Sequence, residues 1–286
     1  MNTIKNIAVI GSGTMGCQIA LQCALFGYKV RLLSRSEESR KKAKEMLMID
    51  IGIMRMDKVI SSEQIAGLIN ALEFKQSLIE TVSGADLIIE TISENKQAKK
   101  QLYKEISAVY PSEAMLVTNT STFLPSMFTE FVADQERYLA LHFHSNVWKS
   151  NIVDIMGHAK TSVESIDRIS AFAVSIGQIP VIMKKERPFY VFNSMIFEVI
   201  RTALQLVTEE VVELGEVDLV WKIILGVQTG PFELMDVIGL DLISEIIDGY
   251  KDATNREVIE KISDYIDSYK EVGKLGRKTG EGFYKY

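Results

Sequence analysis

The chain has 286 residues, of which 47% are hydrophobic and 24% charged, and its formal net charge is −6. This is the composition of an ordinary globular protein with length for about two domains. The negative balance argues against nucleic acid or an anionic membrane as the main partner. No apolar run approaches the roughly 20 residues of a membrane span, and residues 1–5 leave no room for a signal or transit peptide before the first expected strand. We therefore expect a cytoplasmic protein.

The two cysteines, Cys17 and Cys23, both fall in the first expected helix. A spacing of six does not put them on one helix face, so neither a disulfide nor a metal-binding pair is expected. They are typical of small core residues in a reducing compartment. The sequence predicts no metal site.

The first expected strand covers residues 7–10 and runs directly into a glycine-rich turn, G-S-G-T-M-G. The first glycine permits a tight turn, the second lets the backbone approach a pyrophosphate, and the third lets the following helix pack closely. Unpaired N–H groups at the helix N-terminus would bind the phosphates. A second strand at 30–33 completes a βαβ unit, and in this context the glycine motif indicates dinucleotide binding. The residues expected to contact the dinucleotide here are Gly11, Gly13, Thr14, Met15 and Gly16.

Strands and helices alternate through the rest of the first part of the chain. Ser36 is a plausible N-cap for the helix after the second strand. Residues 45–80 are expected to be helical, with breaks at Asp57 and at Ser61–Ser62. Alternation of this kind favours an α/β fold, a doubly wound, mostly parallel sheet with helices on both faces. The further strands are expected at 85–92, 115–118, 138–143, 152–156 and 180–183.

The pattern changes at the charged stretch 184–188, which ends in a proline and suits a domain boundary. Beyond it we expect a smaller all-helical domain, so that residues 1–186 form the dinucleotide-binding domain and 187–286 the second. Such apolar helices in so small a domain suggest a homodimer. The expected helices are 192–214, ended by Gly215, then 218–225, 234–250 and 255–272, with Pro231 and Gly239 as breakers.

Ligands of doubly wound sheets bind beyond the carboxyl ends of the strands. His142 ends an expected strand there and is a candidate general base, although a hydrogen-bonded core histidine is an alternative. Asp154, in the next strand, could accept from its Nδ1–H and fix its tautomer. His144, which alternates with His142, and His158, in a turn, have weaker claims. The remaining candidates, which could polarise a carbonyl or bind an oxyanion, are Ser121, Asn119 and Asn193.

These residues lie in motifs that resemble the 3-hydroxyacyl-CoA dehydrogenase family nearly from end to end. The motifs, in family order, are V-I-G-S-G-T-M-G, A-D-L-I-I-E-T-I-S-E-N, T-N-T-S-T, L-H-F, V-D-I-M and the closing L-G-R-K-T-G-E-G-F-Y-K-Y. The run L-H-F-H-S-N-V-W looks closest to a branch that includes the diketoreductases. The resemblance implies a Rossmann domain, a helical dimerising domain and reversible oxidation of a 3-hydroxyacyl thioester, in which a histidine takes the hydroxyl proton while hydride passes to the nicotinamide.

The resemblance also implies roles for particular residues. The family serine falls on Ser121, its histidine on His142, the acid paired with that histidine on Asp154 and its asparagine on Asn193. The cofactor-contacting glutamate and lysine fall on Glu94 and Lys99, and a tail lysine near the nicotinamide falls on Lys278.

Three positions depart from the family pattern. Ser145 stands where the family asparagine would contact the cofactor, and Asp154 is one methylene shorter than the usual glutamate, so its direct reach to His142 is open. Ser34 replaces the acid that binds the ribose 2′-OH of NAD, and Arg35 follows it. A hydroxyl beside a guanidinium suits a 2′-phosphate, so NADP(H) is favoured. The alternative is an NAD enzyme in which Arg35 is a solvated surface charge.

The leading hypothesis is therefore an NAD(P)-dependent oxidoreductase of 3-hydroxyacyl or 3-oxoacyl compounds, most simply CoA thioesters of fatty acid metabolism. No unmistakable CoA-binding motif is present, so reduction of free 3-oxo or 3,5-dioxo acids and esters, or oxidation of a sugar acid, stays open. A dinucleotide-binding sensor or structural protein is the non-enzymatic alternative.

Overall fold

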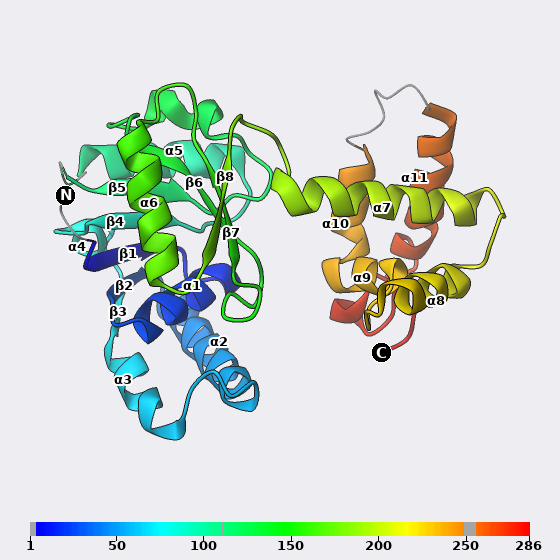
Figure 1. Ribbon diagram of the computed structural model, residues 1–286, viewed down its shortest axis with the longest axis horizontal. Coiled ribbons are helices and arrows are strands. Elements are labelled where there is room, and N and C mark those ends of the chain that lie inside the picture. The colour runs from blue at the N-terminus through cyan, green and yellow to red at the C-terminus, as the bar shows by residue number, and fades with distance from the viewer. Residues whose placement is uncertain (1–3, 110, 112, 249–255) are drawn as a thin grey trace. The chain divides into compact units, whose positions relative to one another are not determined.

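The computed structural model describes residues 4–109, 111, 113–248 and 256–286. It consists of two compact units, which divide between Tyr190 and Val191. The sequence places the same boundary four residues earlier, at 186. The first unit contains the sheet and the second contains helices (Figure 1). Each unit is described by itself.

The first unit is built on an eight-stranded sheet of order β3-β2-β1-β4-β5-β6-β7-β8. Six of the seven strand pairs in the described chain are parallel, and β6 and β7 are antiparallel. The mostly parallel, doubly wound sheet predicted from the sequence is confirmed. The strands are β1 (Asn6–Ile10), β2 (Lys29–Leu33), β3 (Leu72–Lys75), β4 (Leu87–Glu90), β5 (Met115–Thr118), β6 (Tyr138–Phe143), β7 (Ile152–Met156) and β8 (Ile179–Met183).

Helices cover both faces of this sheet because successive strand residues point to opposite sides. Ile7 and Val9 pack in a core with α1 (Thr14–Leu25), α2 (Glu37–Met56), α3 (Ile65–Asn70) and α6 (Val163–Ser175). Ala8 and Ile10 pack in a second core with α4 (Leu78–Val82), α5 (Lys96–Ala108) and the 3₁₀ helix η2 (Pro125–Phe131). Cys17 and Cys23 are free and buried, and burial raises the pKa of the Cys17 thiol to about 12. They serve as core residues.

The expectation of continuous helix over residues 45–80 is wrong in part. Ser36 caps α2 as predicted, accepting from Ser39 N, and α2 ends at Met56, just before the break expected at Asp57. A 3₁₀ turn (Ser62–Gln64) and α3 follow, but Leu72–Lys75 is an edge strand that pairs in parallel with β2. This strand is short and mixes apolar with charged residues, so its sequence has no clear strand pattern. Pairing with β2 determines its conformation, a case of tertiary context overriding local propensity.

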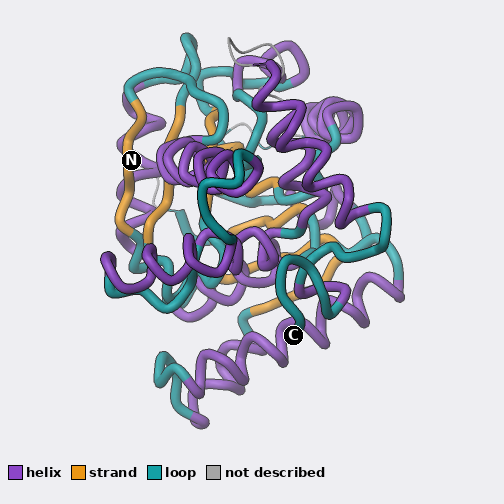
Figure 2. The backbone as a smooth tube through the Cα atoms, turned by 90° about the vertical axis from the view of Figure 1, so that its right-hand side faces the viewer, coloured by secondary structure: helices purple, strands orange, loops and turns teal. Residues whose placement is uncertain are grey.

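The second unit contains α7 (Tyr190–Thr208, which begins at the last residue of the first unit), α8 (Leu214–Leu225), α9 (Pro231–Ile238), α10 (Leu240–Asp248), α11 (Arg256–Lys270) and the 3₁₀ helix η3 (Arg277–Thr279). Figure 2 shows the strands of the described chain in orange, and all of them belong to the first unit. The predicted all-helical domain is confirmed.

Several of its helix boundaries differ from expectation: α7 ends at Thr208, and α8 and α9 begin at Leu214 and Pro231. Gly215 lies in the first turn of α8 and does not end α7, because a capping box between Glu213 and Glu216 starts the new helix there. Gly239, with φ +101°, ends α9 and is the breaker expected from the sequence, so that the expected helix 234–250 is divided into α9 and α10. Residues 249, 250 and 255 of the expected helices lie outside the described part. Within the described chain, no helix is long and apolar enough to cross a membrane.

Candidate active site

The glycine-rich turn has the backbone geometry that its spacing predicts. Gly11 has φ +118°, and a Cβ there would lie 2.8 Å from the carbonyl oxygen of Thr91. A Cβ on Gly16 would collide with the carbonyl oxygen of Gly11. A Cβ on Gly13, in contrast, would meet no atom within 4 Å. Two of the glycines are thus required by the protein itself, while the space at Gly13 is open for a ligand.

Gly13 is also the N-cap of α1, and no side chain among the described residues caps this helix. The first-turn N–H groups are therefore left for an external acceptor. Gly13 and Thr14 are exposed and Met15 is half-buried. An exposed, uncapped helix N-terminus with room for close approach fits the pyrophosphate of a dinucleotide.

A cavity of about 410 Å³ opens beside this turn at the carboxyl ends of β1 and β2. Ser34 lies on its wall with the side chain buried, and its hydroxyl lies 3.2 Å from Ser12 Oγ and 2.8 Å from Ser39 Oγ. Arg35 Nη2 donates to Glu105 Oε2 at 2.9 Å, and both residues line the same cavity. The cavity has the place and polarity to receive the adenosine half of a dinucleotide, and its wall carries the serine–arginine pair singled out in the sequence.

Lys99 belongs to a buried polar network at the end of β4, and the exposed Glu94 lies at the edge of that network. Lys99 is 1% exposed, and its Nζ lies 2.7 Å from Glu90 Oε1 and 3.6 Å from Glu94 Oε2. Glu90, fully buried, also accepts from Tyr103 and Thr118. The predicted contact of Lys99 with a cofactor stays a prediction. Its ammonium group is in the interior, where it orients two carboxylates.

Ser121 follows β5 in a loop that Glu94 holds. Glu94 Oε1 accepts from the Ser121 backbone N–H at 2.5 Å and from its hydroxyl at 3.2 Å, and Thr120 Oγ1 donates to the same carboxylate. Asn119 Oδ1 accepts from Phe143 N at 2.8 Å, which ties this loop to the end of β6. Parallel pairing of β5 with β6 thus places Ser121 and Asn119 at the sheet edge where His142 lies.

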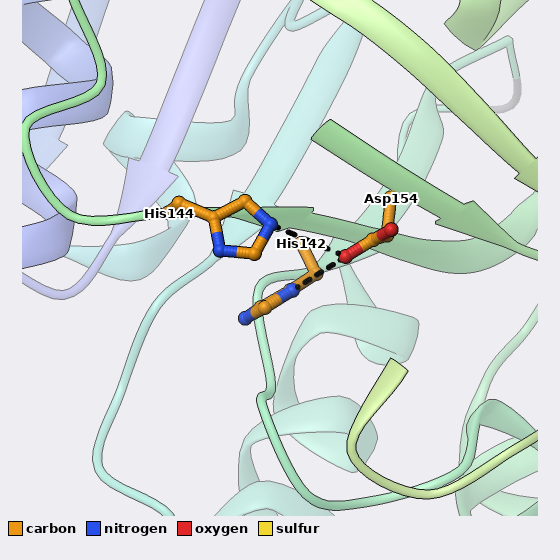
Figure 3. A group of neighbouring side chains, drawn as sticks. All are labelled: His142, His144 and Asp154. Carbon is orange, nitrogen blue, oxygen red and sulfur yellow. Dashed lines mark hydrogen bonds and ion pairs between the residues drawn. The ribbon is translucent and has the colours of Figure 1, made fainter. Parts of the chain in front are cut away.

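His142 and Asp154 contact each other directly. They are paired in the antiparallel register of β6 and β7, so their side chains emerge on the same side of the sheet. His142 Nδ1 lies 3.2 Å from Asp154 Oδ2 (Figure 3). The shorter acid reaches the imidazole because the two strands place the residues opposite each other, which answers the question left open by the sequence.

The two residues influence each other's protonation. Burial lowers the pKa of His142, and Asp154 opposes that shift only in part. Burial acts to raise the pKa of Asp154, but hydrogen bonds from His142 and His144 outweigh it and hold that pKa below its usual value. A neutral imidazole beside an ionised carboxylate is the form that can accept a proton.

Two residues that the sequence left aside are also part of this cluster. His144 Nε2 lies 3.4 Å from Asp154 Oδ2, and its ring packs edge-on to that of His142, with centroids 4.9 Å apart. The spacing of two residues between His142 and His144 was the sequence signal that both side chains could lie on the same side of the chain. Tyr190, fully buried, stacks on His142 at 4.3 Å between centroids. Nothing in its sequence context indicated that contact.

Three predicted site residues make no contact with this cluster among the contacts described for the structure. Asn193 is half-buried in the first turn of α7, in the second unit. Lys278 is in η3 of the same unit, where its Nζ lies 2.5 Å from Asp241 Oδ1. Ser145 is exposed in the loop after β6. Their predicted contacts with substrate or cofactor stay predictions.

A dinucleotide-binding turn and a buried His–Asp pair at the same edge of a doubly wound sheet define the class of nicotinamide-dependent oxidoreductases. Within this class, the chain matches two models of one family. The model for the 3-hydroxyacyl-CoA dehydrogenase NAD-binding domain covers residues 6–187, and that for the C-terminal domain covers residues 190–286. The chain belongs to the 3-hydroxyacyl-CoA dehydrogenase family.

Individual relatives agree with this assignment. Mitochondrial hydroxyacyl-coenzyme A dehydrogenase of Homo sapiens is 27% identical over 294 residues, which cover 99% of this chain and 91% of that protein. A probable 3-hydroxybutyryl-CoA dehydrogenase of Bacillus subtilis is 28% identical, and the match covers 99% of this chain and 98% of that protein. A solved diketoreductase, described as catalysing reactions of dicarbonyl compounds, is 30% identical, covers 100% of both chains and superposes with a TM-score of 0.87.

Proposed function

We propose that this protein interconverts 3-hydroxyacyl and 3-oxoacyl thioesters of coenzyme A, with His142 as the general base. The direct contact of His142 with Asp154, at the carboxyl end of β6, is the observation that carries the proposal. It gives a buried imidazole with one ring nitrogen, Nδ1, held by a carboxylate. The other nitrogen, Nε2, is then available to a substrate hydroxyl.

The nicotinamide of the bound cofactor supplies the acceptor or donor of hydride. In the oxidative direction, His142 Nε2 takes the proton of the 3-hydroxyl group as hydride leaves the carbon that bears it. Asp154 stabilises the imidazolium that forms, through the hydrogen bond to Nδ1. Ser121, whose backbone N–H is held by Glu94, turns its single O–H from Glu94 to the developing carbonyl oxygen and orients it. In reduction, the same proton returns from Nε2 to the oxygen.

Turnover of purified protein tests this proposal. Oxidation of NADPH or NADH is expected with acetoacetyl-CoA, and His142→Gln is expected to lower the rate by roughly 10²–10⁴-fold, as for loss of a general base. His158→Gln is the matched control, because His158 lies outside the cluster, and it is expected to retain the rate. Turnover of the His142 variant near the wild-type rate would remove His142 from this role.

A second candidate substrate class is supported by the similarity to diketoreductase, which extends over both full chains. Free 3-oxo and 3,5-dioxo acids or esters would use the same base and hydride transfer without the nucleotide part of CoA. Comparing kcat/KM for acetoacetyl-CoA with that for a 3,5-dioxo ester separates the two. A ratio below one would assign the protein to the second class.

We further propose NADP(H) as the preferred cofactor. Ser34 brings no charge to the cavity wall, and Arg35 offers a guanidinium to a 2′-phosphate. Glu105, which pairs with Arg35, would compete with that phosphate. Arg35→Ala is therefore expected to weaken NADPH binding by roughly 10–100-fold, the effect of losing a charged hydrogen bond, and Glu105→Gln to strengthen it. Equal effects of Arg35→Ala on NADH and NADPH would contradict the proposal.

A homodimer is proposed for the second unit. Helix α8 exposes Leu219, Val220, Ile223 and Ile224, at positions that share a helix face. A second copy of the chain would cover this apolar face of α8, because most soluble oligomers are symmetric assemblies of identical chains. Light scattering is expected to give twice the chain mass, and Ile223→Glu to give a monomer. The predicted cytoplasmic location stays a prediction.

A further inference from the structure

His142, His144 and Asp154 form a cluster of three metal-ligand side chains, two of them on neighbouring strands and His144 directly after the end of β6. His142 and His144 alternate along the chain at the end of β6, so both point to the same side. Asp154 comes from β7 and lies directly opposite His142. One potential ligand atom from each residue lies within 4.8 Å of the others (Figure 3). The cluster is thus assembled by strand geometry before any ligand arrives.

We propose that this cluster binds a divalent cation that prefers imidazole ligands, with Zn²⁺ as the reference ion. Two imidazoles and one carboxylate are a donor set that zinc accepts, with the fourth position left open. A tetrahedral centre with bonds of about 2.1 Å places its ligand atoms roughly 3.4 Å apart. Asp154 Oδ2 lies 3.2 Å from His142 Nδ1 and 3.4 Å from His144 Nε2. Two of the three ligand separations therefore already have the required length.

Charge gives a second, independent argument for a cation. Asp154 is 1% exposed, and its ion-pair partners in the described chain are these two imidazoles, with no Lys or Arg among them. A buried carboxylate needs compensating positive charge. A cation bound to Oδ2 and to both ring nitrogens supplies it and replaces the two N–H donors. The His144 side chain, 18% exposed, offers the route of entry.

The site has a consequence for the reaction, which rests on the function proposed above. The cation takes His142 Nδ1 and Asp154 Oδ2, the two atoms whose hydrogen bond supports the general base. His142 bound in this way no longer gains the carboxylate's support when it takes a proton. Binding of the cation is therefore expected to inhibit turnover, so that His144 makes the enzyme sensitive to metal.

Equilibrium binding on the full chain tests the site without reference to activity. Protein freed of metal by a chelator is titrated with Zn²⁺ in competition with a chromogenic chelator, and Co²⁺ is added in parallel for its visible spectrum. One ion per chain and the absorption of tetrahedral Co²⁺ are expected. Since loss of an outer-shell partner alone costs about 10–100-fold in affinity, His144→Phe is expected to cost at least about 100-fold.

His158→Gln is the matched control, since it removes the chain's third histidine but leaves the cluster intact. It is expected to bind Zn²⁺ as wild type does, with thermal denaturation confirming that each variant is folded. The site is overturned if wild type binds no Zn²⁺ at millimolar concentration, or if His144→Phe binds it as tightly as wild type. The Co²⁺ spectrum of wild type tests the ligand set even if a variant fails to fold.

Rate measurements separate this inference from the proposed function. Zn²⁺ is expected to inhibit wild type reversibly, with recovery on adding a chelator, and to inhibit His144→Phe only at concentrations higher by the same factor as its loss of affinity. Stoichiometric binding without inhibition would support the site and contradict the role given to His142. Absence of stoichiometric binding would overturn the site whatever the turnover.

Discussion

Glu90 and Lys99 form an ion pair that is closed to solvent, with side chains 0% and 1% exposed and a distance of 2.7 Å from Lys99 Nζ to Glu90 Oε1. The carboxylate also accepts from Tyr103, Thr118 and the backbone of Ile92. A buried charge so fully hydrogen-bonded holds β4, β5 and α5 together behind the loop that carries Ser121.

Removing one partner of this pair should destabilise the protein strongly, because the other charge is then buried without compensation. Lys99→Met and Glu90→Gln are each expected to lower the free energy of unfolding by roughly 3–5 kcal/mol. The double variant is expected to lose much less than the sum, which urea denaturation of wild type and the three variants would measure. Additive losses would mean that the two side chains do not depend on each other.

The glycine turn allows a matched pair of substitutions. Gly16→Ala places a Cβ against the carbonyl oxygen of Gly11 and is expected to cost roughly 3 kcal/mol or more, as an overpacked site does. Gly13→Ala meets no protein atom within 4 Å, so its stability should stay within about 0.5 kcal/mol of wild type. Its affinity for NADPH, measured by fluorescence titration, should nevertheless fall because the methyl group occupies the phosphate approach. Unchanged affinity would place the phosphates elsewhere.

Asp154 should act on the reaction through His142. Asp154→Asn keeps the size of the side chain but removes the charge that supports the imidazolium, so kcat is expected to fall by roughly 10²–10⁴-fold. Asp154→Glu keeps the carboxylate and should lose less. Steady-state rates of both variants, taken with a chelator present, check this order. Equal rates for the Asn and Glu variants would show that charge is not what Asp154 contributes.

His158 should make stability depend on pH. Its Nε2 donates to Gln135 O at 3.0 Å and its Nδ1 accepts from Lys160 N, so the neutral ring is the form that fits. Burial lowers the pKa of His158 below the unfolded value of about 6.5. Between these two values the unfolded chain binds more protons, so this contribution is present above pH ~6.5 and is lost as pH falls through the folded pKa.

Melting temperatures of wild type and His158→Gln between about pH 7.5 and 5.5 measure this contribution. The fall in Tm over that range should be smaller in the variant than in wild type. Comparing the two falls removes contributions from other groups, which both proteins share. A variant that loses as much Tm as wild type would show that His158 titrates without affecting folding.

Much of the fold was predictable because its determinants are local. The apolar runs of the central strands, the glycine turn and the Ser36 cap each act within one turn or strand. Leu72–Lys75 was missed because nothing local marks it as a strand. Its conformation depends on the edge of β2, which the intervening 38 residues bring alongside.

The sequence by itself determined the βαβ dinucleotide turn, the helical second unit and the candidates His142, Asp154 and Ser121, because residue type and spacing encode these directly. The tertiary structure alone decided that Asp154 reaches His142, that His144 joins them and that Lys99 is turned inward to Glu90. The physical reason is register. An antiparallel pairing of β6 with β7 brings together side chains twelve residues apart, and no local pattern specifies which residues will lie opposite each other.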